Sequence, residues 1–381
     1  MDNNKKRILV FIDWFDPAFK AGGPIRSIVN FVEHLHTEFH IYIVTGAYDL
    51  GSTVPLNGIA INTWNDYNGK AKVYYAEKDQ LRPGSIQNII KEVEPDFIYL
   101  NSFFSLKFTI YPLLLKLFGK VNTTYVLAPR GMLKGSALAF KKNKKLLFLY
   151  LFRWSGIAGR IRFQATDEQE RKDILRHFPM ASPILAPNLP GAVAKHPYPI
   201  IKVAGTIRIL FVGRVHPIKN LHRLLETIGT VKGAIQLSII GMKESETYWQ
   251  QCEQLIAAFP ASVQVQFLGE QPHEVILQQL QRHHIFALPT QGENFGHAIF
   301  ESLSNGRPVL ISDQTPWRNL TAQQAGWDLP LQDPTSFSTA LQTAVDWDQE
   351  TFDRFAQGAL QVASGFLTGS NDIKNYHLLF N

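Results

Sequence analysis

Short apolar strand segments alternate with helical segments along this chain, and the alternation starts twice. The first half has predicted strands at Arg7–Ile12, Ile41–Thr45, Phe97–Leu100 and Tyr125–Ala128, and an amphipathic helix at Ile25–Val32. The second half has predicted strands at Ile207–Gly213, Ile235–Gly241, Val263–Gly269, Ile285–Pro289 and Arg307–Asp313, and helices at Leu221–Ile228 and Ala298–Leu303. Because helices between strands produce parallel neighbours, the pattern predicts the α/β class with mostly parallel sheets.

A stretch rich in Pro and Gly separates the two halves, from Ala186 to Gly191 and on to Pro199. The chain of 381 residues is long enough for two domains. We therefore expect two Rossmann-like, doubly wound domains, residues 1–190 and 191–365, that face each other across a cleft. Residues 366–381 follow breakers between Gly365 and Ser370, and we expect them to form a short helix that returns to the first domain.

Two glutamates flank a turn that contains glycine in the segment Gln291–Glu301. Glu293 falls on the loop after a strand, and Glu301 falls on the helix that follows. Ligands of open α/β sheets bind at the carboxyl ends of strands, and carboxylates accept hydrogen bonds from vicinal hydroxyls. A glycosidase pair needs carboxyl groups about 5–9.5 Å apart, whereas eight helical residues span roughly 12 Å. Distinct roles along one polyhydroxylated ligand therefore fit these glutamates better.

Two cations follow the first strand of the second domain. Arg214 and Lys219 are predicted near the start of the next helix, where the helix terminus already favours anions. A diphosphate is the natural ligand for this arrangement, although surface cations are often only solvated. Gly22 and Gly23 follow the first strand of the chain and would let a backbone approach a phosphate. The chain has no G-x-G-x-x-G segment and no Walker loop, which argues against a dinucleotide dehydrogenase and a P-loop NTPase.

Arg130 follows the strand that ends at Ala128, so we expect it to face the cleft. It would either bind an anionic group of a substrate or form a structural ion pair, and the sequence leaves both open.

The segment Lys141–Phe152 joins a basic run to an apolar run. It fits either a buried helix with a solvated start or an element that contacts an anionic membrane surface.

Composition limits the classes of protein that this chain can belong to. Hydrophobic residues make up 45% and charged residues 18%, which is typical of a globular protein. The net charge of +6 is concentrated in residues 1–190, but we expect no nucleic-acid partner. The absence of a secretory signal and the single Cys252, expected to be structural, favour a cytoplasmic protein. The scattered histidines lack metal spacing, so no metal and no cofactor is predicted.

In this order and spacing, the motifs resemble those of the retaining glycosyltransferases of family 4, which have GT-B architecture. Gly22-Gly23 is similar to the first glycine loop of the family, and Phe211–Arg214 with Lys219 to its phosphate-binding segment. The span from Glu293 to Glu301 matches its E-x7-E signature. Further landmarks that resemble the family are Thr166–Glu170, Pro187-Asn188 and Gly306-x-Pro308.

The resemblance implies a role for each of these residues. Glu301 would hold the ribose of a nucleotide diphosphate sugar, linked to UDP or GDP. Glu293 would contact the donor sugar and act in catalysis with Arg214 and Lys219, which would neutralise the departing diphosphate. Asn294, Phe295 and Gly296 would offer backbone amides to the donor.

Many members of the family carry a His at the position of Arg130. The sequence Pro129–Leu133 instead resembles the members that assemble bacterial polysaccharides. The resemblance then implies a glycan or a lipid-linked glycan as acceptor, and a place in the cytoplasm or, as a peripheral protein, at the inner face of the cytoplasmic membrane. Two rival functions remain: a sugar-nucleotide epimerase of GT-B type, and a two-domain sugar-binding protein without activity.

Overall fold

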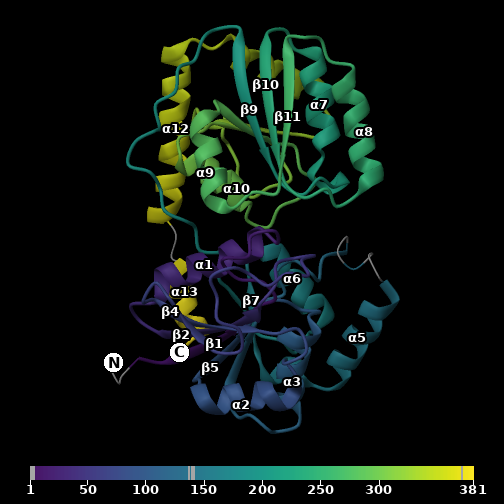
Figure 1. Ribbon diagram of the computed structural model, residues 1–381, viewed down its shortest axis with the longest axis vertical. Helices are drawn as coiled ribbons and strands as arrows, with labels where there is room; N and C mark the ends of the chain where they lie inside the picture. The colour runs from purple at the N-terminus through teal and green to yellow at the C-terminus, as the bar shows by residue number, and fades with distance from the viewer. Residues whose placement is uncertain (1–4, 136–137, 139–141, 370–371) are drawn as a thin grey trace. The chain divides into compact units, whose positions relative to one another are not determined.

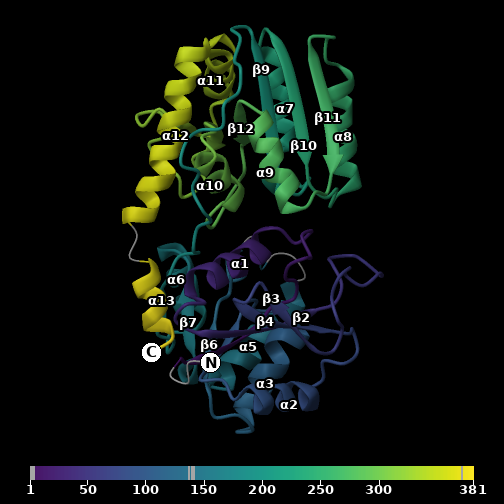
Figure 2. The ribbon, with the colours of Figure 1, turned by 60° about the vertical axis from the view of Figure 1, so that its left-hand side comes forward.

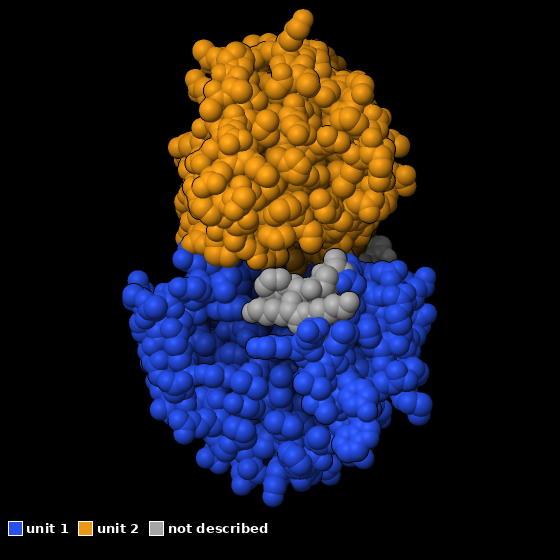
Figure 3. Space-filling model, turned by 90° about the vertical axis from the view of Figure 1, so that its right-hand side faces the viewer, with its two compact units in different colours: residues 1–189, 371–381 blue, residues 190–370 orange. Residues whose placement is uncertain are grey.

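The chain forms two compact units, coloured separately in Figure 3: residues 1–189 with 371–381, and residues 190–370. The structure is a computed structural model that describes residues 5–135, 138, 142–369 and 372–381. The boundaries drawn from the sequence, after residues 190 and 365, differ most at the second position, where the chain leaves unit 2 only after residue 370.

Unit 1 is built on an eight-stranded sheet with the order β3-β4-β2-β1-β5-β6-β7-β8 (Figure 1). All neighbouring strands are parallel except β3, which pairs antiparallel with β4 at one edge. The strands are β1 (Arg7–Phe11), β2 (His40–Gly46), β3 (Trp64–Tyr67), β4 (Ala71–Ala76), β5 (Phe97–Leu100), β6 (Thr124–Leu127), β7 (Arg162–Ala165) and β8 (Pro183–Leu185). The chain order reverses between β1 and β5, so a doubly wound sheet results.

Both faces of this sheet are buried, because successive strand residues point to opposite sides. In β1, Ile8 and Val10 join one core, which also holds residues of α1 (Gly23–Leu35) and α13 (Asp372–Leu379). Leu9 and Phe11 join the other core. That second face is covered by α2 (Pro83–Val93), η1 (Leu106–Ile110), α3 (Tyr111–Leu117), α5 (Lys142–Trp154), η2 (Ile157–Arg160) and α6 (Glu168–His177).

The last two helices belong to different units. Helix α12 (Gln349–Gly369) runs straight through Gly365, so the predicted break at that glycine is wrong; Ser370 lies outside the described residues. A glycine inside a helix costs only about 1 kcal/mol, and here Phe366 and Leu367 pack on the core of unit 2. Helix α13 lies in unit 1, where the Phe380 ring stands 5.6 Å from that of Phe97.

Unit 2 contains a six-stranded sheet in which every neighbouring pair is parallel. Its order is β11-β10-β9-β12-β13-β14, so the chain order reverses between β9 and β12. The strands are β9 (Thr206–Val212), β10 (Ala234–Ile240), β11 (Val263–Gly269), β12 (Ile285–Leu288), β13 (Val309–Ser312) and β14 (Gly326–Leu329). Two doubly wound units with mainly parallel sheets confirm the predicted α/β class.

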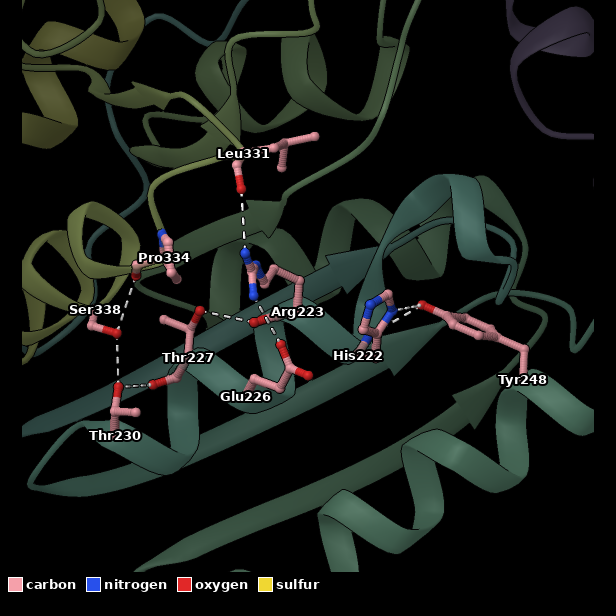
Figure 4. Close-up of polar contacts among 9 residues, drawn as sticks. All are labelled: His222, Arg223, Glu226, Thr227, Thr230, Tyr248, Leu331, Pro334 and Ser338. Atoms are coloured by element: carbon pink, nitrogen blue, oxygen red, sulfur yellow. Dashed lines mark hydrogen bonds and ion pairs between the residues drawn. The ribbon is translucent and has the colours of Figure 1, made fainter. Parts of the chain in front are cut away.

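Helices cover both faces of the second sheet (Figures 1 and 2). They are η3 (Pro217–Lys219), α7 (Leu221–Thr230), α8 (Glu246–Ala257), α9 (His273–Arg282), α10 (His297–Ser304), α11 (Pro334–Asp346) and α12. Polar contacts fix α7 between two neighbours (Figure 4): the Tyr248 hydroxyl of α8 accepts from the His222 N–H at 3.1 Å, and the Thr230 and Ser338 hydroxyls of α7 and α11 lie 2.8 Å apart. The start of α7, directly after Lys219, is therefore held in place.

Two buried histidines at the start of β12 should make unit 2 sensitive to acid. His283 donates to the Gln279 carbonyl. His284 accepts from the Arg208 backbone N–H at 2.9 Å, which requires a neutral ring. Burial lowers the pKa of each to about 4, from an ordinary 6.5. In the unfolded chain the two imidazole rings are protonated below about pH 6.5, whereas in the folded unit they are protonated only below about pH 4. Stability present above pH 6.5 is therefore lost as the pH falls.

Between pH 7 and pH 5, we expect the free energy of unfolding to drop by about 3–4 kcal/mol through this pair. Urea unfolding at the two pH values measures the loss, and NMR titration assigns it to the residues. Histidine Cε1–H resonances of His283 and His284 that titrate near 6.5 would contradict the explanation.

Candidate functional site

Two loops that carry predicted site residues, those after β9 and β12, lie at the carboxyl edge of the sheet in unit 2. β9 and β12 are hydrogen-bonded neighbours, and the loops after both strands leave at their carboxyl ends. In an open α/β sheet, the point where the strand order reverses leaves a crevice outside these ends, and ligands bind there. Lys219 follows β9 and Glu293 follows β12. The fold therefore places both residues at the position where such a sheet binds ligands.

Lys219 and Glu293 form an ion pair across this reversal point. Their side chains are only 17% and 15% exposed, so the pair is largely screened from water. Backbone contacts hold the two loops together: the Gln291 N–H donates to the Ile218 carbonyl at 2.8 Å, and the Thr290 hydroxyl donates to the same oxygen at 3.1 Å. Glu293 is also fixed from the next strand, since its N–H donates to the Gln314 carbonyl at 3.1 Å.

Arg214 lies on the other side of β9, toward β10. Its guanidinium donates to both carboxylate oxygens of Glu244, at 2.9 and 2.8 Å. The side chains are 49% and 34% exposed, and such exposed pairs contribute at most about 1 kcal/mol. Arg214 is thus oriented at the carboxyl edge by a partner that it can exchange for another anion at little cost.

Glu301 has a partner of its own. It lies on α10 with a side chain that is 13% exposed, and its carboxylate is 2.9 Å from Nε2 of His273 at the start of α9. Glu293 and Glu301 therefore contact different cationic or titratable groups. This arrangement agrees with separate roles for the two carboxylates.

The turn between the two glutamates prepares the start of α10. Gly296 is the N-cap residue with φ 77°, a conformation that side chains rarely adopt, and an added Cβ would lie 2.9 Å from the Ile299 side chain. No side chain caps the helix. Phe295 anchors the turn, because its ring is buried among aromatic residues and its carbonyl accepts from the Trp317 indole at 2.7 Å. Asn294, Phe295 and Gly296 thus lie on a rigid turn beside Glu293.

Three of the predicted site residues lie in unit 1. Gly22 is the N-cap of α1 with φ 65°, and Gly23 is the first residue of that helix. A Cβ on Gly22 would meet nothing within 4 Å, so its backbone conformation alone requires glycine.

Arg130 also lies in unit 1, after β6, where it is engaged by neighbours. Its guanidinium donates to the Tyr99 hydroxyl at 2.8 Å, to Asn101 at 2.7 Å and to the side chain of Asn188. The buried Glu170 accepts from the next N–H, that of Gly131. These contacts favour the structural alternative for Arg130, as a hydrogen-bond network in place of the expected ion pair. Glu170 and Asn188, which belong to the motif landmarks named above, therefore hold the segment around Arg130 in place.

Sequence reasoning missed five partners of the site residues: Glu244, His273, Gln314, Tyr99 and Asn101. None belongs to a recognisable motif, and each reaches its partner only through the packing of loops or strands distant in sequence. The periodicity of the chain carries no information on such contacts.

The described residues were compared with the side-chain groupings that metal and thiol chemistry need. Among these residues, no three His, Cys, Asp or Glu side chains are grouped as for a metal ion. Cys252 is buried on α8, and burial raises the pKa of its thiol to about 11, which makes it a poor nucleophile at neutral pH.

Comparisons with known proteins concern the family and the fold. Residues 199–361 match the family model "Glycosyl transferases group 1", which covers most of unit 2 and its site. No curated protein sequence matches the chain. Solved structures are similar in fold at low sequence identity, and the three described next each match more than nine tenths of the chain.

Sucrose-phosphate synthase from Thermosynechococcus elongatus superposes with a TM-score of 0.69 at 16% identity, over 99% of both chains. Anabaena HepE, solved with UDP-glucose, gives 0.67 at 14% identity, over 98% of this chain and 99% of its own. WaaG, a glycosyltransferase involved in lipopolysaccharide biosynthesis, gives 0.56 at 13%, over 94% and 95%. The chain therefore has the fold of GT-B glycosyltransferases, and it carries a glycosyltransferase domain of group 1, which makes it a transferase.

Proposed function

We propose that this chain, which carries a group 1 glycosyltransferase domain, is a retaining enzyme of the family 4 type. It moves a hexose from a UDP- or GDP-linked donor to a glycan or lipid-linked glycan acceptor in surface polysaccharide synthesis. The observation that carries the proposal is the nearly buried pair of Lys219 and Glu293 at the reversal point of the second sheet.

Charge development in the reaction explains why two cations stand at this edge. Cleavage of the bond between sugar and diphosphate leaves negative charge on the diphosphate, and preorganised positive groups stabilise it. Lys219 and Arg214 hold their charges in place through Glu293 and Glu244. A bound diphosphate offers both cations a second anion, and the uncapped start of α10 adds oriented N–H groups.

The two glutamates then act on different parts of the donor. Once Lys219 is shared with the diphosphate, Glu293 accepts hydrogen bonds from hydroxyls of the sugar that is transferred. Glu301, held by His273, accepts from the ribose hydroxyls. HepE was solved with UDP-glucose, which supports a uridine nucleotide donor for a protein of this fold. WaaG acts in lipopolysaccharide biosynthesis, which supports a glycan acceptor.

A panel of nucleotide sugars tests the function. We expect UDP- or GDP-sugars to raise the melting temperature of the protein and to be hydrolysed slowly without acceptor, because a glycosyltransferase uses water when no acceptor is present. Lys219→Ala should abolish the thermal shift, whereas Lys91→Ala, at an exposed site on α2, should leave it unchanged.

The products separate the proposal from its rivals. Conversion of the donor to an isomeric sugar nucleotide would identify an epimerase. Binding of free sugars without any turnover, in the presence of lipid-linked and glycan acceptors, would identify a sugar-binding protein. NMR of the transferred sugar decides between retention and inversion at its anomeric carbon.

A further inference from the structure

Helix α5 presents a row of large apolar side chains to solvent. Leu147, Tyr150, Leu151 and Trp154 are 61%, 67%, 50% and 81% exposed. Their spacing of three and four residues puts them on one face of the helix, and Figure 1 shows α5 on the outside of unit 1. Contiguous apolar surfaces of this kind mark interaction sites in soluble proteins.

The opposite face of α5 fixes the helix in this orientation. Leu149 and Phe152 are buried, and the Phe152 ring lies 4.9 Å from that of Phe178 and 5.2 Å from that of Phe103. Rotation that buried the outer row would expose this inner cluster. Of the alternative left open by the sequence, a buried helix with a solvated start, the described part of the segment shows burial on one face only; Lys141 lies outside the described residues.

Positive charges border the apolar row. Lys144 and Arg153 are exposed near the two ends of α5, and none of its residues from 142 to 154 is acidic. After a two-residue connection, η2 lines a cavity of about 410 Å³ together with Lys116, Arg160 and the highly exposed Met180. No acidic residue is among those described at this cavity. The segment that follows α5 in the chain thus also lies among basic residues.

We propose that α5 lies in the surface of an anionic lipid bilayer, with the row Leu147, Tyr150, Leu151 and Trp154 inserted among the acyl chains nearest the headgroups. Amphipathic helices bind in this way when cations flank their apolar face, and Trp and Tyr favour the interfacial depth. A second copy of the chain is a poorer partner for this face than an anionic bilayer. A symmetric dimer through the face would bring Lys144 and Arg153 of one copy close to the like charges of the other. Binding itself is independent of the proposed transfer reaction.

The described part of the chain contains no helix long and apolar enough to cross a membrane. The contact that we propose is peripheral, because α5 would lie in the surface of the bilayer. If the proposed function holds, this contact brings unit 1 to the surface where a lipid-linked acceptor is found.

Sedimentation with vesicles tests the proposal on the full chain. We expect binding to vesicles that contain phosphatidylglycerol, little binding to phosphatidylcholine alone, and weaker binding at high salt because screening shortens the reach of the charges. Replacing Lys144 and Arg153 together by Gln should weaken binding roughly thirtyfold, at about a factor of five for each cation. Lys91→Gln with Lys374→Gln, at exposed sites elsewhere, is the matched control.

The apolar row has its own variant and control. Leu147→Ser with Leu151→Ser and Trp154→Ser should abolish binding, whereas Val54→Ser with Ile201→Ser, also at exposed sites, should not. Brominated acyl chains should quench fluorescence in the wild type more than in Trp154→Phe. Equal sedimentation of the wild type and the triple Ser variant overturns the proposal. Equal quenching of the wild type and of Trp154→Phe overturns it as well. The proposal is also overturned if light scattering shows a dimer for the wild type and a monomer for the triple Ser variant, because this face would then be an interface between two copies of the chain.

Discussion

Replacing Lys219 by Ala should lower kcat/KM for sugar transfer by about a thousandfold. The ammonium of Lys219 stands at the reversal point of the second sheet, where the proposed reaction places the departing diphosphate, and a preorganised group aimed at developing charge contributes about 100- to 1000-fold. The loss should exceed this single contribution slightly, because Glu293 would be left without its cation and would repel the donor. Initial rates with the donor identified in the nucleotide panel measure the effect.

Three further variants separate the causes. Lys219→Arg retains the charge and should recover part of the rate. Glu293→Gln should also reduce transfer severely, and the double variant Lys219→Ala with Glu293→Gln should lose less than the product of the single losses, since the two groups act as a pair. Lys232→Ala, at an exposed site of the same unit, should be close to the wild type. Near-normal turnover of Lys219→Ala in a folded protein rules out the assigned role.

Replacing Arg307 by Met should reduce the free energy of unfolding of unit 2 by about 3–4 kcal/mol. The side chain is wholly buried, and its guanidinium donates to the carbonyls of Leu280 and Tyr198 at 2.8 Å and to that of Gln281 at 3.1 Å. Burial lowers its pKa to about 10, so it is still charged at neutral pH. Met has similar length but no donors, and each buried carbonyl left unpaired costs about 1–3 kcal/mol.

Part of that cost is offset, because Met has no charge to remove from water. Urea unfolding followed by tryptophan fluorescence measures the change. Arg282 is the matched control, since it lies exposed at the end of α9, and Arg282→Met should change stability by less than about 0.5 kcal/mol. Equal effects of the two substitutions would show that the buried hydrogen bonds contribute nothing specific.

Much of the site was predictable because strand ends are local features. The apolar runs before Arg214 and Glu293 identify two strands, and parallel strands of one sheet share a carboxyl edge. The sequence therefore predicts that Lys219 and Glu293, which are 74 positions apart, lie at one edge of the sheet. The turn could also be predicted, because glycine favours turns. Gly296 has the positive φ that this residue type adopts most readily.

The helix ends and exposed faces were less predictable, for a physical reason. Gly365 signals a helix break locally, yet α12 continues because packing of Phe366 and Leu367 outweighs a glycine's helix penalty. In α5, apolar residues occupy both faces, so periodicity gives no direction for the core. Only the contacts of Phe152 with Phe103 and Phe178 decide that Leu147 and Trp154 point outward.

The class of the fold, the two α/β units and the edge on which Lys219 and Glu293 lie can be predicted from the sequence, because hydrophobic period and strand ends are properties of short segments. The pairing of each site residue is visible only in the folded chain: Lys219 with Glu293, Arg214 with Glu244, and Glu301 with His273. Such pairs depend on strand order and on loops meeting in space, and the order of strands in a sheet is fixed by packing among distant segments.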